Sequence, residues 1–393
     1  MTYVLTGFVL LLALHIARRL GWATDLPRRA RWGVGAATLA IAAWAGLSGG
    51  FARGADNAAA LRLWTFPGLV VLGFLWYLLL GLWVTGLVSL VLRVVDRGRP
   101  RPMAGGVSRR VRWVRGLTAV SLVAAVVVTG YGRWMSERPR ITEHSYVSAQ
   151  LPAEFDGLRV AFLSDVHVGP AIDGGFLARV VAQVNDARPD LIVLGGDFVD
   201  GSVTTLAGDV EPLRNLRATY GVVAVSGNHE FYSGAAEWLA YWRTLGITVL
   251  DNDAVVITRG TASIDVIGVN DRSGEPPHVE DLQAALRKLE SSYQVRVGDT
   301  ARFRLLAAHQ PRQALTGDNL AARSGIDLQL SGHTHGGQMW PFMYLVPLQQ
   351  PVVSGWKTIG GVDVLTSRGV GGWGPPLRVG ADPEVLLVTL RRG

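Results

Sequence analysis

The chain contains no cysteine among its 393 residues. This absence excludes disulfide bonds, thiolate metal ligands and a cysteine nucleophile. It leaves the cellular compartment open, because proteins of reducing and of oxidising compartments can both lack cysteine. Any metal site in this protein must therefore do without cysteine ligands.

Acidic residues are scarce in the first 140 positions. That stretch carries 18 arginines, no lysine and only four acidic residues, Asp25, Asp56, Asp96 and Glu137, which gives a net charge of +14. The remainder carries 20 basic and 27 acidic residues, which gives −7. The larger, acidic part would repel phosphate backbones, so we expect no nucleic-acid partner. Its carboxylates suit a metal site instead.

Charged residues are also absent from the interiors of four apolar runs, at residues 2–17, 33–49, 67–92 and 116–132. A helix needs about 20 apolar residues to cross a bilayer, and about 17 to 25 are tolerated. The pattern predicts an all-α transmembrane region of about four helices over residues 1–140. The alternative is a buried helical bundle of a soluble protein. A cleaved signal peptide is disfavoured, since Arg18 and Arg19 follow the first run instead of preceding it.

The arginines are distributed unevenly over the loops between these runs. The first loop carries five and the third carries eight, whereas the second carries only Arg53 and Arg62. Because arginine-rich loops stay cytoplasmic, we expect a multi-pass protein of the cell membrane whose C-terminal domain is extracytoplasmic. Arg133, Arg138 and Arg140, just after the fourth run, argue for the opposite orientation.

From about residue 150, short apolar runs that end in polar and glycine residues alternate with amphipathic helical patterns. The alternation predicts an α/β domain with largely parallel strands. We place it at residues 155–393, after a linker at 141–154. The expected strand segments are 158–167, 190–197, 221–230, 302–311 and 326–338, and the expected helices lie near 173–187, 234–245, 279–290 and 312–323.

The ends of the five expected strands carry side chains that can bind a metal ion. In parallel α/β sheets, ligand sites lie beyond the carboxyl ends of the strands. Five of the chain's eight histidines fall at these ends, which scattered core histidines would not do. The pattern therefore predicts one common cluster, made of Asp165, His167, Asp197, Asn228, His229, His309, His333 and His335.

The strand ends read "SDVHVG", "GGDFVD", "SGNHE", "AAHQP" and "SGHTHGGQ" in this order. Over residues 155–393 this series resembles the calcineurin-like metallophosphoesterase family, and the tail "LTSRGVGGWGPPLRVGADPEVLLVTL" at residues 365–390 resembles the closing strands of the family's membrane-associated bacterial branch. The resemblance implies a four-layer α/β/β/α sandwich with two divalent metal ions, and sulfur-free ligands suit Mn, Fe or Zn. By motif position, Asp165, His167 and His335 would bind the first metal. Asn228, His309 and His333 would bind the second, and Asp197 would bridge both.

This set of ligands suits phosphate-ester hydrolysis. Two cations about 3.5 to 4 Å apart reduce the repulsion between hydroxide and phosphate and acidify a shared water. His229, next to Asn228, is expected to protonate the leaving group, a role worth about 10²–10⁴ in rate. Glu230 either orients an imidazole or is a simple carboxylate at a helix start. Asp200 is expected to turn or cap the chain.

Several further polar residues are candidates of lower interest. His278 is expected to be a solvated loop histidine, and His144 the same in the linker. Arg368 and Arg378 would either contact a phosphate or pair with Asp382 and Glu384. Gln338 and Trp340 follow the histidine pair and are candidates for substrate contact.

The sequence thus predicts a membrane-anchored phosphoesterase that cleaves a phosphodiester, pyrophosphate or phosphomonoester bond by attack of a metal-bridging hydroxide. Family analogy suggests a lipid-linked substrate of the UDP-2,3-diacylglucosamine type, although an external domain suits a cytoplasmic nucleotide-sugar badly. Fold alone does not determine the substrate. The alternative is a catalytically weak metal-binding sensory or interaction module at the membrane. A transporter is disfavoured, because the apolar runs contain no acidic residue or lysine.

Overall fold

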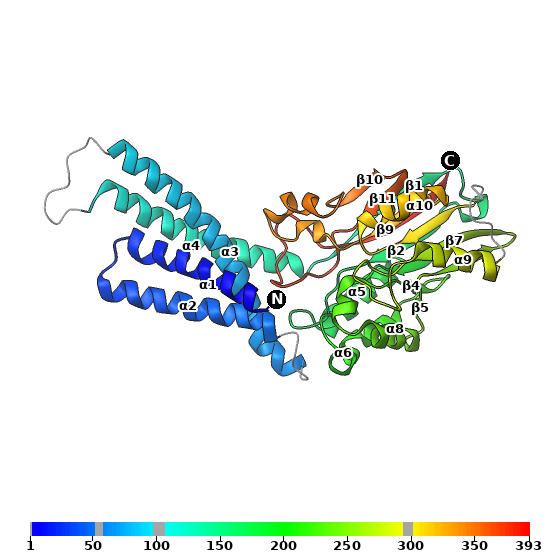
Figure 1. The fold of residues 1–393 in the computed structure, drawn as a ribbon, viewed down its shortest axis with the longest axis horizontal. Coiled ribbons are helices and arrows are strands. Elements are labelled where there is room, and N and C mark those ends of the chain that lie inside the picture. The colour runs from blue at the N-terminus through cyan, green and yellow to red at the C-terminus, as the bar shows by residue number, and fades with distance from the viewer. Residues whose placement is uncertain (1, 52–57, 97–106, 294–301) are drawn as a thin grey trace. The chain divides into compact units, whose positions relative to one another are not determined.

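The computed structural model describes residues 2–51, 58–96, 107–293 and 302–393 (Figure 1). Arg53, Asp56, Arg97, Arg99 and Arg101, which entered the charge argument, lie outside the described residues. The chain divides into two compact units. The first comprises most of residues 1–134 together with Gly374–Leu377, and the second comprises Met135–Trp373 and Arg378–Gly393.

Long helices make up the first unit. Each of the four expected apolar runs is helical, in α1 (Thr2–Arg18), α2 (Arg28–Phe51), α3 (Ala58–Val95) and α4 (Arg109–Ser136), with a short π-helix, η1 (Arg19–Ala23), after α1. Among the described residues, two helical segments are long and apolar enough to cross a membrane, Arg62–Val95 and Arg109–Ser136. The length and composition of two helices support membrane association, but they do not confirm four spans.

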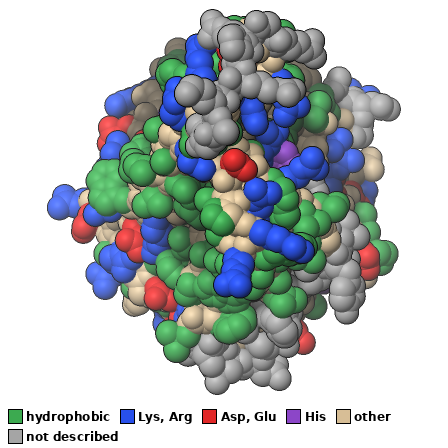
Figure 2. Space-filling model, turned by 90° about the vertical axis from the view of Figure 1, so that its left-hand side faces the viewer, with side chains coloured by type: hydrophobic (Ala, Val, Ile, Leu, Met, Phe, Trp, Pro, Cys, Tyr) green, Lys and Arg blue, Asp and Glu red, His purple; other side chains and the backbone are tan. Residues whose placement is uncertain are grey.

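Helices α3 and α4 expose apolar side chains along one side. On α4, Val120, Val123 and Val127 are each more than 60% exposed. Water disfavours such stripes, whereas lipid does not. Polar contacts hold the other side, where Thr85 of α3 lies 3.3 Å from Ser121 of α4 between their hydroxyl oxygens. Figure 2 shows Lys and Arg side chains among hydrophobic ones on the face turned toward the viewer.

The second unit contains two six-stranded sheets. The first has the order β1-β12-β2-β3-β4-β5 and the second the order β10-β11-β9-β8-β7-β6. The strands of the first sheet are β1 (Arg140–Ser148), β12 (Glu384–Arg392), β2 (Arg159–Leu163), β3 (Leu191–Leu194), β4 (Val222–Ala224) and β5 (Thr248–Val249). Those of the second are β10 (Gly355–Ile359), β11 (Val362–Thr366), β9 (Leu328–Ser331), β8 (Arg304–Ala307), β7 (Ala262–Gly268) and β6 (Asp253–Arg259).

All five expected strands are present as β2, β3, β4, β8 and β9, and within each sheet they pair in parallel. The expected helices are present as α5 (Gly174–Asp186), α8 (Ala235–Thr244), α9 (Leu282–Tyr293) and α10 (Thr316–Arg323), and α6 (Val203–Val210) and α7 (Asn228–Tyr232) are additional. The first half of the segment 141–154, which we expected to be a linker, is a strand in the structure. Arg140–Ser148 forms β1, which pairs in parallel with β12 over nine residues, because β12 offers it a free sheet edge.

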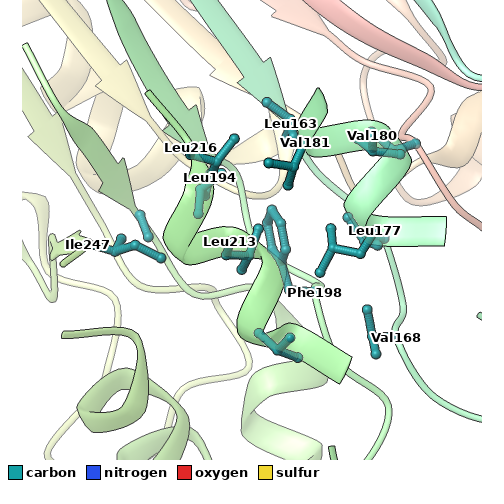
Figure 3. Packing of buried hydrophobic residues seen from close by; sticks show 14 of the residues in the cluster. Leu163, Val168, Leu177, Val180, Val181, Leu194, Phe198, Leu213, Leu216 and Ile247 are labelled. Atoms are coloured by element: carbon teal, nitrogen blue, oxygen red, sulfur yellow. The ribbon is translucent and has the colours of Figure 1, made fainter. Parts of the chain in front are cut away.

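Three hydrophobic clusters hold these elements together. The first joins α5, α6 and α8 to one face of the first sheet, as in the packing of Leu177 and Val181 on Leu163 and Leu194 (Figure 3). The second cluster consists of residues of both sheets, such as Phe162 and Leu305. The third joins α9 and α10 to the second sheet. Alternate side chains of one strand therefore serve different clusters, which fixes the direction in which each strand end points.

Candidate metal centre

The predicted site residues lie directly after the strands that carry them. Asp165 and His167 follow β2, Asp197 follows β3, and Asn228 and His229 begin α7 after β4. In the second sheet, His309 follows β8, and the pair His333 and His335 follows β9. Because the neighbouring strands within each sheet are parallel, their carboxyl ends meet at one edge, and the ligand-bearing loops of both sheets converge.

One group of potential ligand atoms brings together Asp165, His167 and His335. The Nε2 atoms of His167 and His335 are 3.1 Å apart, and His335 Nε2 lies 3.5 Å from Asp165 Oδ1. All three residues are buried. Two imidazole nitrogens and a carboxylate oxygen at these separations suit a single divalent cation.

A second group brings together Asp197, His309 and His333. Asp197 Oδ2 lies 3.1 Å from His309 Nε2, and His309 Nε2 lies 3.2 Å from His333 Nδ1. The same Asp197 oxygen lies 3.8 Å from His167 Nε2 of the first group. Asp197 also forms a third group with His167 and His229, so its carboxylate lies between the two sets of ligand atoms.

Asn228 provides an independent test of whether the site fits a second cation. Its residue is 7% exposed, and its carbonyl Oδ1 is buried without a hydrogen-bond partner among the described residues. A buried polar atom without a partner costs free energy and calls for a ligand. Asn228 precedes His229, whose backbone N–H donates to Asp197 Oδ1 at 2.8 Å. The residues present thus fit a pair of divalent cations.

Asp200 connects the metal groups to His229. Its Oδ1 lies 3.0 Å from Nδ1 of His167 and 2.5 Å from Nδ1 of His229. The expectation that Asp200 merely turns or caps the chain is therefore wrong, because the "GGDFVD" loop directs its carboxylate at two imidazoles. A carboxylate on Nδ1 fixes the ring orientation and leaves Nε2 for a metal or a substrate.

Burial and neighbouring charges shift the pKa values of His229 and His335 in opposite directions. Burial alone would lower the pKa of His229, but the hydrogen bond to Asp200 and the charges of Asp197 and Asp200 raise that pKa to about 9. Burial and the positive charges of His167 and Arg378 lower the pKa of His335. A neutral imidazole binds cations and a charged one donates protons, so the two rings suit different tasks.

Glu230 lies in the first turn of α7 and accepts the backbone N–H of the N-cap residue Gly227, as the interpretation of a carboxylate at a helix start predicts. It is fully buried, and it accepts the backbone N–H groups of Asp197 at 2.8 Å, Phe198 at 2.7 Å and Gly227 at 2.7 Å. Burial and the charge of Asp197 raise the pKa of Glu230 to about 7. Its role is to tie the loop of the shared carboxylate to the loop of Asn228.

The backbone of the site is strained at several of the predicted metal ligands. Positive φ at a non-glycine residue costs about 1–3 kcal/mol and persists where the surroundings impose it. Six such residues lie here, namely Asp165 (57°), His167 (56°), Asp197 (58°), His333 (70°), His335 (51°) and Gln338 (52°). Glycines permit the close approach of these loops. A Cβ on Gly227 would lie 2.2 Å from Asp197 Oδ1, and one on Gly332 would lie 2.3 Å from Asp165 Oδ2.

The two arginines of the glycine-rich tail have separate roles. Arg368 pairs with Glu384, one of the two expected alternatives. Arg378 is fully buried and donates to the carbonyl oxygens of His335 at 2.8 Å, Arg368 at 2.7 Å and Gly371 at 2.8 Å. It therefore holds the tail against the histidine pair. Sequence spacing could not identify this role, because Arg378 binds backbone carbonyl groups and lies 43 residues after His335.

Two further histidines differ from their expected solvated state. His278 Nδ1 lies 3.0 Å from Asp251 Oδ2, and its side chain is 20% exposed. His144 lies in β1 and accepts a hydrogen bond from Trp356 Nε1 at 3.2 Å. Both are engaged by neighbours because the loop and the supposed linker pack onto the domain.

Fold and site together have the features of a calcineurin-like phosphoesterase domain. The model of the calcineurin-like phosphoesterase family matches residues 158–337. An uncharacterized metallophosphoesterase of Aquifex aeolicus is 30% identical over 269 residues, which are 68% of this chain and 97% of the relative. The chain belongs to the calcineurin-like phosphoesterase family, whose members are hydrolases with two divalent metal ions.

Two other relatives differ in how much of this chain they match. An uncharacterized metallophosphoesterase of Helicobacter pylori is 35% identical over 256 residues, and the match spans 64% of this chain and 64% of that relative. A protein of Danio rerio described as a transmembrane protein with metallophosphoesterase domain is 29% identical over 333 residues, 82% of this chain and 72% of its own. Together with the two candidate spans, this relative supports membrane association.

We expect Asp200→Asn to weaken the site without unfolding it. Both His167 and His229 would lose a charged partner on Nδ1, and loss of such a partner typically costs about 10- to 100-fold in activity or metal affinity. Hydrolysis of p-nitrophenyl esters, measured over a range of Mn²⁺ concentrations, checks this. Wild-type activity at every Mn²⁺ concentration would show that Asp200 is dispensable.

Proposed function

We propose that this protein is a membrane-anchored hydrolase of phosphodiester, pyrophosphate or phosphomonoester bonds. The proposal depends on one observation, that the ligand groups meet at Asp197. The buried Oδ1 of Asn228, which has no hydrogen-bond partner among the described residues, supports it. By this proposal Asp165, His167 and His335 hold one divalent cation, Mn, Fe or Zn, and Asn228, His309 and His333 hold the other. Asp197 bridges the two.

When bound, two such cations would neutralise the phosphate charge and make a water molecule acidic enough to attack near neutral pH. The protein residues perform the other tasks. Asp200 and Glu230 fix the rings and the bridging loop through the contacts described above. The positive φ values keep Asp165 and Asp197 aimed inward before any substrate arrives, so little reorganisation is needed in the transition state.

His229 serves the leaving group. As the oxygen of water bonds to phosphorus, the bond from phosphorus to the leaving oxygen breaks and its electron pair stays on that oxygen. A proton from His229 then neutralises the developing alkoxide. The Asp200 carboxylate, 2.5 Å from His229 Nδ1, favours the charged imidazole that can make this donation.

A substrate screen tests the function. Full-length protein in detergent is stripped of metal, reloaded with Mn²⁺, Fe²⁺ or Zn²⁺ and assayed with p-nitrophenyl phosphate and bis-p-nitrophenyl phosphate. We expect hydrolysis of at least one ester that depends on the metal. An apo protein that binds two ions but stays inert toward every ester would favour the alternative, a metal-binding sensory or interaction module.

We also propose that all four helices α1 to α4 lie in the cell membrane and that the phosphoesterase domain faces the extracytoplasmic side. The distribution of arginines over the loops supports this orientation. We expect a C-terminal alkaline phosphatase fusion to be active and a C-terminal green fluorescent protein fusion to be dark. The reverse pair of results would place the domain in the cytoplasm.

The finer architecture and the substrate class are part of the proposal. Three hydrophobic clusters, in the sequence helices, sheet, sheet, helices, support the four-layer α/β/β/α arrangement of residues 155–393. Membrane association favours an ester found at a membrane, and a lipid-linked substrate of the UDP-2,3-diacylglucosamine type is the family's example. The negative charge of the domain opposes a nucleic-acid partner.

A further inference from the structure

Two exposed aromatic side chains contact the imidazole of His229. The ring centroid of Tyr232 lies 5.3 Å from that of His229, and the ring centroid of Trp373 lies 6.2 Å from it, both in edge-to-face geometry. Tyr232 is 67% exposed and Trp373 is 48% exposed, whereas the His229 side chain is only 13% exposed. The mostly buried imidazole of His229 is thus flanked by two aromatic rings that are open to solvent.

The backbone of each aromatic residue is positioned by the loops that carry the predicted ligands. Tyr232 is the last residue of α7, the helix that begins with Asn228. The backbone of Trp373 is clamped by the amide of Gln338, because its N–H donates to Gln338 Oε1 at 3.0 Å and its carbonyl accepts from Gln338 Nε2 at 2.9 Å. Gln338 follows the histidine pair directly. The spacing between the rings and His229 is therefore built into the loops that carry the ligands.

We infer that Tyr232 and Trp373 form a subsite for an apolar leaving group, an aromatic ring or a hydrocarbon chain attached at the scissile oxygen. The inference rests on the proposed function, in which His229 protonates that oxygen. His229 Nδ1 is occupied by Asp200, so donation falls to Nε2, and the group bonded to the protonated oxygen lies beside the rings. An apolar leaving group would bind more tightly there, because it buries aromatic surface. A polyol would gain little binding free energy from the same contact.

The test compares leaving groups rather than absolute rates. Phenyl, decyl and glyceryl phosphates, and the matching methyl diesters, are assayed with the Mn²⁺-loaded full-length protein and with Trp373→Ala and Tyr232→Ala. The ratio of mutant to wild-type kcat/KM is taken for each ester, so that the intrinsic reactivity of each leaving group cancels. We expect a loss of about tenfold per ring, equivalent to about 1.4 kcal/mol, for the phenyl or the decyl ester, mainly through KM.

For the glyceryl ester, we expect a ratio within about twofold of one. A loss confined to the phenyl ester identifies an aromatic leaving group, and one confined to the decyl ester identifies a hydrocarbon chain. Equal losses for all three esters would overturn the inference. A wild type that hydrolyses no ester with any metal would instead overturn the proposed function, and the subsite with it.

Two controls separate recognition from folding. Tyr344→Ala removes a side chain of similar exposure, 71%, in the short helix η7 (Phe342–Tyr344), and should leave every ratio near one. Trp373→Phe should restore most of the binding. As a readout without turnover, calorimetry with phenylphosphonate and methylphosphonate should show weakening in Trp373→Ala for the phenyl compound only. Equal weakening of both compounds would mean that Trp373 acts on the phosphoryl site and not on a leaving group.

Discussion

His229→Ala should lower kcat for phosphate-ester hydrolysis by about 10²–10⁴, the range typical for loss of a general acid. The substitution removes the imidazole that Asp200 holds at 2.5 Å and none of the proposed metal ligands. Its backbone N–H, which donates to Asp197 Oδ1, is retained. Metal content and thermal stability in Mn²⁺ should therefore stay near wild-type values. Steady-state kinetics with p-nitrophenyl esters test the expected loss of kcat, and metal analysis of the same samples tests the expected retention of metal.

The loss of kcat in His229→Ala should depend on the acidity of the leaving alcohol. Protonation matters most when the departing alcohol is weakly acidic, so the deficit should be larger for an alkyl ester than for a p-nitrophenyl ester. His278→Ala is the matched control, because His278 also has Nδ1 on a carboxylate, that of Asp251 at 3.0 Å, and lies outside the metal groups. A kcat for His229→Ala within threefold of wild type would refute the assignment.

Asp197→Asn should abolish the paired metal site. The carboxylate lies 3.1 Å from His309 Nε2 and 3.8 Å from His167 Nε2, so it is the residue that both groups share. An amide oxygen carries no negative charge, so it attracts a pair of cations far more weakly than a carboxylate does. We expect at most one metal ion per chain and a fall in kcat/KM of about 10³ or more, since several kcal/mol of charge stabilisation is lost.

Asp265→Asn is the control for removal of a buried carboxylate. Asp265 is fully buried and pairs with Arg302 and Arg304, away from the proposed ligands. It should lose stability, because a buried ion pair loses its negative charge, yet it should retain two metal ions per chain. Full activity and two ions in Asp197→Asn would rule out the bridging role.

The order of the motifs predicted from sequence that the predicted ligand side chains lie close together. The reason is that neighbouring parallel strands end at the same edge of a sheet, whatever the length of the chain between them. "SDVHVG" and "SGHTHGGQ" are separated by more than 160 positions, yet the Nε2 atoms of His167 and His335 are 3.1 Å apart. The five strands and four of the helices followed from apolar periodicity for the same reason. Those features depend on local patterns repeated along the chain.

The supporting residues were harder to anticipate. Asp200 and Glu230 lie in the motifs, but their tasks depend on loop geometry, and the left-handed backbone at Asp197 cannot be inferred from an aspartate in a sequence. Arg378 acts through carbonyl groups, which carry no sequence signal. β1 was missed because an edge strand that is half exposed, with burial alternating along it, resembles a polar linker.

The central claim is that one pocket formed by both sheets holds two cations bridged by Asp197. Anomalous diffraction from crystals of the full chain grown with Mn²⁺ tests it most directly. The account predicts two peaks about 3.5 to 4 Å apart, one contacted by Asp165, His167 and His335 and the other by Asn228, His309 and His333. A single peak, or two peaks that Asp197 does not join, would contradict it.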